Sequence, residues 1–152
     1  MLAGLLTEHS VVCLSGILVS AYALYVEMRK SKDKNYKAVC DIGENMSCSR
    51  VLTSKYSKGF GLVELLVGKD HFMNLPNCLI GIVFYLFQLC LGMVGSSWCN
   101  SLLLITSIMS CVGSVYLGYI LFVILKDICL VCIATYIVNG TLFYLNYQRV
   151  LS

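Results

Sequence analysis

The chain has 152 residues, of which 59% are hydrophobic and 12% are charged. Because soluble domains usually carry about 25% charged residues, this composition excludes an ordinary soluble domain and indicates a membrane protein. The formal net charge of +3 is too small to favour a nucleic-acid partner. No Gly/Ser-rich linker divides the chain, so we expect a single membrane domain over residues 1–152.

Stretches without Asp, Glu, Lys or Arg define the predicted spans, and they cover residues 9–26, 72–125 and 128–148. A span needs roughly 20 apolar residues, so the middle stretch holds two spans around a turn at 95–100. The alternative for the first span is a cleaved signal peptide, but the basic n-region and the small-residue cleavage site are missing. The four transmembrane helices are expected at about 9–27, 74–95, 99–123 and 127–148.

A polar loop at about 28–73 separates the first two spans and holds most of the basic residues, together with Cys40 and Cys48. Near its end, residues 60–67 are predicted as a short helix whose apolar face anchors this loop in the membrane interface. The alternative is that these apolar residues form a small core within the loop itself.

Cys129 and Cys132 stand three residues apart at the start of the last span. A Cys-x-x-Cys pair at a helix N-terminus is a recurring redox arrangement, because the positive end of the helix dipole favours the reactive thiolate. Helical spacing puts Tyr136 and Asn139 on the same face, deeper in the span. The pattern indicates thiol chemistry on an apolar substrate.

Four spans place the polar loop and the start of the last span on one side of the membrane, whichever way the chain is inserted. We therefore expect Cys40, Cys48, Cys129 and Cys132 to meet at one end of the bundle. The other five cysteines are expected to be dispensable, although Cys78 lies near that end. The positive-inside rule would put the basic loop in the cytosol. Disulfide exchange belongs to an oxidising lumen, and we predict the luminal side.

Other functions fit parts of this pattern. Zinc is disfavoured because the loop pair is spaced Cys-x7-Cys and neither His9 nor His71 has ligand spacing with a cysteine pair. No Gly-x-Gly-x-x-Gly turn is present, so a bound dinucleotide is not supported. We expect neither a metal nor a bound cofactor. A thiol oxidase that passes electrons to a quinone, and a non-catalytic four-span scaffold, stay open from these residues.

Several motifs resemble the vitamin K epoxide reductase family in residue type and in order, over about residues 12–149. They are Cys40–Asp41–Ile42–Gly43, Ser47–Cys48–Ser49–Arg50, Gly59–Phe60–Gly61–Leu62, Asn77, Phe84–Tyr85, Gly113–Ser114–Val115–Tyr116–Leu117 and Cys129–Leu130–Val131–Cys132. Residues 47–50 lean toward the reductase and Leu125–Lys126 toward its close paralogue, which leaves that choice open.

The resemblance implies an all-α integral membrane enzyme of the endoplasmic reticulum, with a four-transmembrane-helix bundle and a luminal cap loop. It would reduce vitamin K 2,3-epoxide to the quinone, and the quinone to the hydroquinone that supports gamma-carboxylation. Coumarin anticoagulants such as warfarin would be its inhibitors, and a luminal thiol oxidoreductase would be its electron donor.

Roles for four cysteines follow from the same motif match. Cys132 is the thiolate that attacks the substrate, and Cys129 resolves the adduct as the Cys129–Cys132 disulfide forms. Cys48 then exchanges with Cys129, and Cys40 releases Cys48 and receives electrons from the donor. This sequence is thiol–disulfide exchange carried across one protein.

Asn77 and Tyr136 match the family's hydrogen-bond donors to the two quinone oxygens. Tyr136 lies seven residues beyond Cys129, roughly 10 Å deeper at 1.5 Å per residue. A buried donor aimed at an oxygen that gains negative charge stabilises the transition state more than the ground state. The resemblance implies that the apolar walls of the pocket are Phe60, Phe84, Leu117, Leu121 and Val131.

Overall fold

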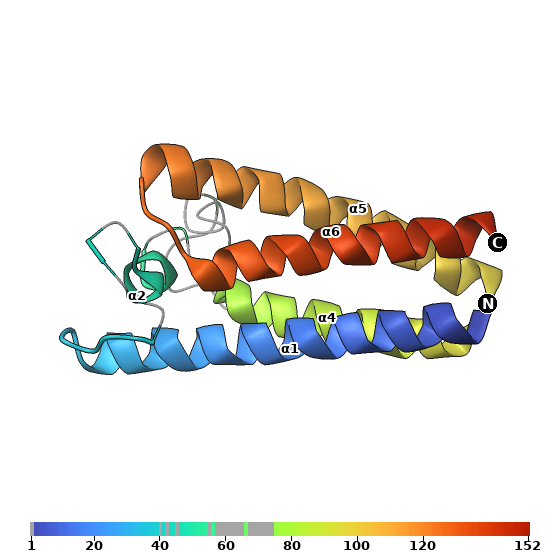
Figure 1. The fold of residues 1–152 in the computed structure, drawn as a ribbon, viewed down its shortest axis with the longest axis horizontal. Coiled ribbons are helices and arrows are strands. Elements are labelled where there is room, and N and C mark those ends of the chain that lie inside the picture. The colour runs from blue at the N-terminus through green and yellow to red at the C-terminus, as the bar shows by residue number, and fades with distance from the viewer. Residues whose placement is uncertain are drawn as a thin grey trace.

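The computed structural model describes residues 2–39, 41, 43–44, 46–54, 56, 66 and 75–152. Four helices in these ranges are long and apolar enough to span a membrane, and they run side by side as one bundle (Figure 1). The predicted all-α, four-helix membrane fold is therefore confirmed.

The helices in chain order are α1 (Leu2–Lys32), α2 (Cys48–Leu52), α4 (Asn77–Val94), α5 (Ser97–Tyr119), the π-helical turn η3 (Ile120–Ile124) and α6 (Leu130–Leu151). α1 packs against α4 and α6, and α5 packs against α6. Both chain termini lie at one end of the bundle, and α2 lies at the other end (Figure 1).

α1 extends beyond the predicted span of 9–27 in both directions. The absence of charge locates the apolar part of a helix and not its ends, since Glu, Lys and Arg are themselves good helix formers. Three basic residues occupy the last turn, where cations interact favourably with the helix dipole. The predicted interfacial helix at 60–67 lies outside the described residues, apart from Leu66, which is helical and exposed.

The connection between α4 and α5 is tighter than the predicted turn at 95–100. Gly95 ends α4 with φ 72°, a left-handed conformation that glycine adopts without steric cost. Ser96 follows directly as the N-cap of α5, and its side chain accepts a hydrogen bond from the N–H of Cys99.

The turn between α5 and α6 sets the position of the Cys-x-x-Cys segment. The N–H of Leu125 donates to the carbonyl of Ile120 at 2.8 Å, which closes the π-helical turn. Lys126 follows with φ 51°, and the N–H of Asp127 donates to the carbonyl of Leu121 at 3.2 Å. The chain is thereby turned back so that α6 starts beside the end of η3.

At the end of the bundle that holds the termini, buried polar side chains join the helices. The Gln88 amide donates to the Thr106 hydroxyl at 2.7 Å, and the Asn146 amide donates to Gln88 Oε1 at 3.0 Å. The Arg149 guanidinium donates to the carbonyl of Gly92 at 2.6 Å. Gln88, Asn146 and Arg149 are all buried, and we call these three residues with Thr106 and Gly92 the distal polar network.

Candidate active site

Cys48 is the first residue of α2, a short turn in the polar loop between α1 and α4. We call this loop the cap. Ser47 is the N-cap of α2 and accepts a hydrogen bond from the N–H of Arg50. The Asp41 carboxylate accepts hydrogen bonds from the Ser47 hydroxyl at 2.9 Å and from the Ser49 hydroxyl at 2.6 Å. Cys48 is fully buried between them and is disulfide-bonded. Asp41 therefore fixes the turn on which this cysteine stands.

Asp41 is held as a carboxylate by these contacts. Burial alone would raise the pKa of Asp41, but hydrogen bonds from the Ser49 hydroxyl, the backbone N–H groups of Ala38 and Ser49, and the Ser47 hydroxyl outweigh it. Together they lower the pKa of Asp41 to about 2. Its acceptor role is therefore kept throughout the physiological pH range.

Asp127 fastens this turn to the start of α6. Its Oδ1 accepts hydrogen bonds from the N–H of Ser47 at 3.2 Å and from the N–H of Ile128 at 3.0 Å. Its Oδ2 pairs with the Arg50 guanidinium at 3.1 Å. A parallel β-bridge between Met46 and Ile128 runs beside these contacts. Since Asp127 is only 8% exposed, the pair lies partly out of water.

Cys48 and Cys129 lie in one buried apolar cluster, and Cys132 packs against it. Cys48 and Cys129 have no exposed surface. The structure therefore brings three of the four predicted redox cysteines together at the cap end of the bundle. Cys40, the fourth, lies outside the described residues.

The two cysteines of the Cys-x-x-Cys segment are not equivalent. Cys129 is the N-cap of α6, and its sulfur accepts a hydrogen bond from the N–H of Cys132 at 3.4 Å. The Cys132 thiol and the N–H groups of Cys132 and Val131 lower the pKa of Cys129, against the opposing effects of burial and of Asp127. The helix-dipole effect predicted for the pair therefore acts mainly on Cys129 in the structure.

A cavity of about 690 Å³ lies beneath the cap, between the four long helices. Ligand sites in proteins typically measure about 300–1,000 Å³. Cys132 lines this cavity, whereas Cys129 lies behind it in the apolar cluster. Phe60 lies outside the described residues. The other predicted substrate residues all line the cavity: Asn77, Phe84, Leu117, Leu121, Val131 and Tyr136.

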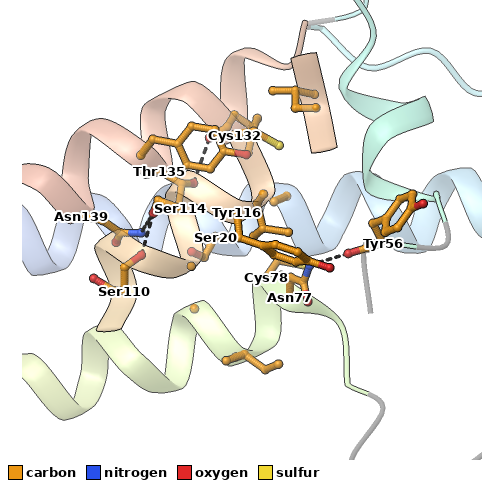
Figure 2. A pocket seen from close by; sticks show the side chains of 18 of the residues that line it. Ser20, Tyr56, Asn77, Cys78, Ser110, Ser114, Tyr116, Cys132, Thr135 and Asn139 are labelled. Carbon is orange, nitrogen blue, oxygen red and sulfur yellow. Dashed lines mark hydrogen bonds between the residues drawn. The ribbon is translucent and has the colours of Figure 1, made fainter. Parts of the chain in front are cut away.

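The two predicted hydrogen-bond donors stand on different helices. Asn77 is the first residue of α4, and its amide donates to the carbonyl of Tyr56 in the cap at 2.7 Å (Figure 2). Tyr136 on α6 follows Cys132 by one helical turn and lines the same cavity. The two predicted donors thus stand at the cap edge of the cavity and one turn beyond the thiol.

Asn139 lies on the same helical face as Cys132, and its amide bonds to other helices, whereas the Asn77 amide bonds to the cap. Its amide donates to the Ser114 hydroxyl at 2.7 Å, and its Oδ1 accepts from the Tyr85 hydroxyl at 2.6 Å. Figure 2 shows Asn139 beside Ser114 at the inner part of the cavity wall. Both sides of the Asn139 amide are therefore engaged in joining α4, α5 and α6.

Sequence analysis did not single out Asp41, Asp127 or Glu27 as parts of the site. Asp41 and Asp127 hold the cap turn, and Glu27 accepts a hydrogen bond from Cys78 inside the cavity. The signal for Asp127 is its place as an acid between an apolar span and the Cys-x-x-Cys pair. Glu27 ends the first charge-free stretch, and nothing in its spacing points to Cys78.

Known proteins match most of this chain. Residues 9–147 match the family model described as Vitamin K epoxide reductase family. The chain is 46% identical over 138 residues to vitamin K epoxide reductase complex subunit 1 of Mus musculus. It is 44% identical over 138 residues to the Rattus norvegicus protein of the same name. Each match covers 91% of this chain and 86% of the relative.

The matched region contains all of the elements that build the site. It includes the cap turn with Cys48, the cavity walls on α4 and α5, and the Cys-x-x-Cys start of α6. The resemblance drawn from the motifs is thereby confirmed. This chain belongs to the vitamin K epoxide reductase family and is a multi-pass membrane oxidoreductase of that type.

Proposed function

We propose that this protein reduces vitamin K 2,3-epoxide to the quinone, and the quinone to the hydroquinone that supports gamma-carboxylation. The observation that carries the proposal is a thiol, Cys132, in the wall of an apolar cavity of about 690 Å³ beneath a cysteine-bearing cap. A flat, lipophilic quinone ring suits such walls, and its tail extends between membrane-spanning helices. The printed names of the mouse and rat relatives support the same substrate.

In the proposed reaction Cys132 attacks the substrate and Cys129 resolves the adduct. The two thiols give up two electrons and become the Cys129–Cys132 disulfide. Protonation at the substrate oxygens then yields water and the quinone from the epoxide, or the hydroquinone from the quinone. Deprotonation of Cys132 supplies the attacking thiolate. The Cys129 sulfur, which accepts a hydrogen bond from the N–H of Cys132 at 3.4 Å, is the proposed neighbouring base for this proton.

Electrons return by exchange through the cap. Cys48 attacks Cys129 and frees Cys132, and Cys40 then attacks Cys48 and frees Cys129. The shared cluster of Cys48 and Cys129 supports the first exchange. Stabilisation of a Cys129 thiolate at the N-cap supports the second, because a thiol of low pKa is the better leaving group.

We assign Cys40 as the disulfide partner of Cys48. After the cap pair has reduced the inner pair, a luminal thiol oxidoreductase would reduce the cap disulfide again. This donor requires the cap to lie on the luminal side of the endoplasmic reticulum membrane.

Asn77 and Tyr136 are the proposed donors to the two substrate oxygens. Tyr136 follows Cys132 by one helical turn and lines the same cavity, so a ring attacked by Cys132 would have an oxygen near this hydroxyl. A 4-hydroxycoumarin carries oxygens on a similar flat bicyclic ring, and we propose that coumarin anticoagulants such as warfarin compete for the same donors. Phe60, Phe84, Leu117, Leu121 and Val131 are the proposed apolar walls.

The test is dithiothreitol-driven conversion of vitamin K epoxide in membranes from cells that express the chain. We expect quinone and hydroquinone products, and a Cys132→Ala variant expressed at equal level should form none. A non-catalytic scaffold predicts no turnover with either protein. A dedicated thiol oxidase predicts no loss of the epoxide, but reduction of a quinone at the expense of protein thiols.

A further inference from the structure

We propose that Glu27 is a positioning residue that keeps a second cavity thiol, Cys78, protonated and outside the thiol relay. The inference rests on the proposed function in one respect, namely that the relay runs through Cys48, Cys129 and Cys132.

The geometry begins with a hydrogen bond between α1 and α4. The Cys78 thiol donates to Oε2 of Glu27 at 3.1 Å. Glu27 is 5% exposed and Cys78 is 9% exposed, and both line the cavity beneath the cap. Figure 2 shows Cys78 next to Asn77, on the wall of the cavity that α4 provides. A carboxylate and a thiol are thus paired inside the proposed substrate site.

Cys78 stands apart from the other cysteines to which the relay assigns no role. Among the free cysteines of the described residues, the lining of the cavity includes Cys78 and Cys132 but not Cys13, Cys90, Cys99, Cys111 or Cys129. Cys78 also belongs to the buried cluster that contains Cys48 and Cys129. A competing thiol therefore lies among the groups that exchange disulfides.

As a thiolate, Cys78 would divert the relay. It would attack the sulfur of Cys132 in the Cys129–Cys132 disulfide, so that the Cys78–Cys132 bond forms and Cys129 leaves as a thiolate. The N-cap position stabilises that leaving group, as it does when Cys40 attacks Cys48 and frees Cys129. Because only a thiolate attacks a disulfide, the protonation state of Cys78 decides whether this side reaction occurs.

Burial of Cys78 already favours its neutral thiol, and Glu27 adds two effects of the same sign. A hydrogen bond from the thiol to the carboxylate stabilises the neutral thiol, and the negative charge of Glu27 opposes a second negative charge on sulfur. Replacement by Gln keeps the size of the side chain but removes both effects. Its amide N–H also offers a donor to the thiolate, so Glu27→Gln should switch Cys78 on.

The first measurement is alkylation by N-ethylmaleimide, followed by mass spectrometry of the full chain in detergent at constant pH. The thiolate adds to the maleimide double bond, a carbon–sulfur bond forms, and the adjacent carbon takes a proton from water. We expect Cys78 to react more slowly than Cys132 in the wild-type protein, and about tenfold faster in Glu27→Gln than in wild type. Glu8→Gln, which removes an exposed acid from α1, is the matched control and should leave both rates unchanged.

The second measurement is turnover of vitamin K epoxide with dithiothreitol. Glu27→Gln should lose activity and accumulate the Cys78–Cys132 disulfide, while Glu27→Gln combined with Cys78→Ser should recover the activity of Cys78→Ser alone. A purely structural role for Glu27 predicts that the double variant stays impaired. That result, rapid alkylation of wild-type Cys78, or equal Cys78 rates in wild type and Glu27→Gln would each overturn the proposal.

The two proposals fail separately. Alkylation needs no turnover, so slow Cys78 in the wild type and fast Cys78 in Glu27→Gln would support the role of Glu27 even if the epoxide were not reduced. If the epoxide were turned over and Cys78 were alkylated at the same rate in wild type and Glu27→Gln, the proposed function would stand and this inference would be wrong.

Discussion

The cap end and the terminal end of the bundle differ in where their polar contacts lie. At the cap end, the helices surround an apolar cavity, and the polar contacts lie above it, where Asp41 and Asp127 hold the turn of Cys48. At the terminal end, the distal polar network runs between the helices themselves, through Gln88, Asn146 and Arg149. The cap end contains a cavity between the helices, and the terminal end contains hydrogen-bonded side chains between them.

This difference shows how a membrane bundle tolerates a large cavity. Apolar side chains give little preference between a neighbouring helix and lipid, so hydrogen bonds and close packing hold transmembrane helices together. The distal polar network and the Asn139 bonds supply such contacts away from the thiols. The cap end is then free to carry reactive groups and empty volume.

The largest expected effect is that of Cys48→Ala, which tests the cap cysteine separately from the cavity thiol. Cys48→Ala breaks the relay in the cap but leaves Cys129 and Cys132 as free thiols below it. Turnover driven by a protein thiol donor should fall to background, whereas dithiothreitol should still drive measurable turnover, because a small dithiol can reach the inner pair. Equal losses with both reductants would contradict the relay, and Cys90→Ala is the control.

Tyr136→Phe tests the polar contact inside the cavity. Loss of a hydrogen bond to a charged oxygen costs about 1.5–3 kcal/mol, so inhibition by warfarin should weaken by roughly 10- to 150-fold. Turnover of the epoxide should fall less, because Cys132 and the lipid tail also hold the substrate. Inhibition and turnover are measured side by side in the same membranes. Normal values of both would remove Tyr136 from the site.

Gly92→Ala addresses the terminal end. A Cβ atom at Gly92 would lie 2.7 Å from the His9 ring and 3.2 Å from the Arg149 guanidinium. Overpacking of this kind typically costs about 1–3 kcal/mol, so the melting temperature of the detergent-solubilised protein should fall. Gly140→Ala is the matched control, because nothing lies within 4 Å of its added Cβ. If the Gly92 variant lost warfarin binding without a fall in melting temperature, the two ends would not be independent.

The pH dependence of the cap should follow Asp41. Its pKa of about 2 lies below the ordinary value of about 3.9, so its stabilising contribution is fully present above pH 4. That contribution is lost as the pH falls from about 4 toward 2. We would measure the protection of backbone amides against hydrogen exchange in the segment around Cys48, relative to the intrinsic exchange rate at each pH. Protection should fall in this window for the wild type and should be low at pH 4 and at pH 2 for Asp41→Asn. A wild-type segment that stays protected at pH 2 would contradict the role of Asp41.

The smallest expected effect is none. A combined variant with Cys13, Cys78, Cys90, Cys99 and Cys111 replaced by Ser should reduce vitamin K epoxide at the wild-type rate with dithiothreitol, because the proposed relay uses none of these thiols. Single replacements identify the responsible position if the combined variant is slow. A loss caused by Cys78→Ser alone would require a catalytic role for that thiol.

The charge-free stretches predicted four membrane-spanning helices, and the described residues contain four, because charges are costly in a bilayer. Six of the seven substrate residues implied by the family motifs line the cavity, and their role in binding stays a prediction. The sequence did not distinguish Cys129 from Cys132, because that depends on where α6 begins, at Leu130. Contacts such as Asp127 with Ser47 and Cys78 with Glu27 join residues 80 and 51 positions apart, which no local pattern reports.

The unequal lengths of α1 and α4 have a consequence for how the two reactants arrive. With 31 residues, α1 measures about 46 Å, whereas α4 with 18 residues measures about 27 Å, close to the hydrocarbon thickness of a bilayer of about 30 Å. In a bilayer of this thickness α4 would start near the lipid headgroups, while the basic end of α1 would stand in water beside the cap. Under the proposed function, a substrate dissolved among the acyl chains would then reach the cavity from the lipid, and a water-borne electron donor would reach the cap. Oxidant and reductant would arrive from different phases.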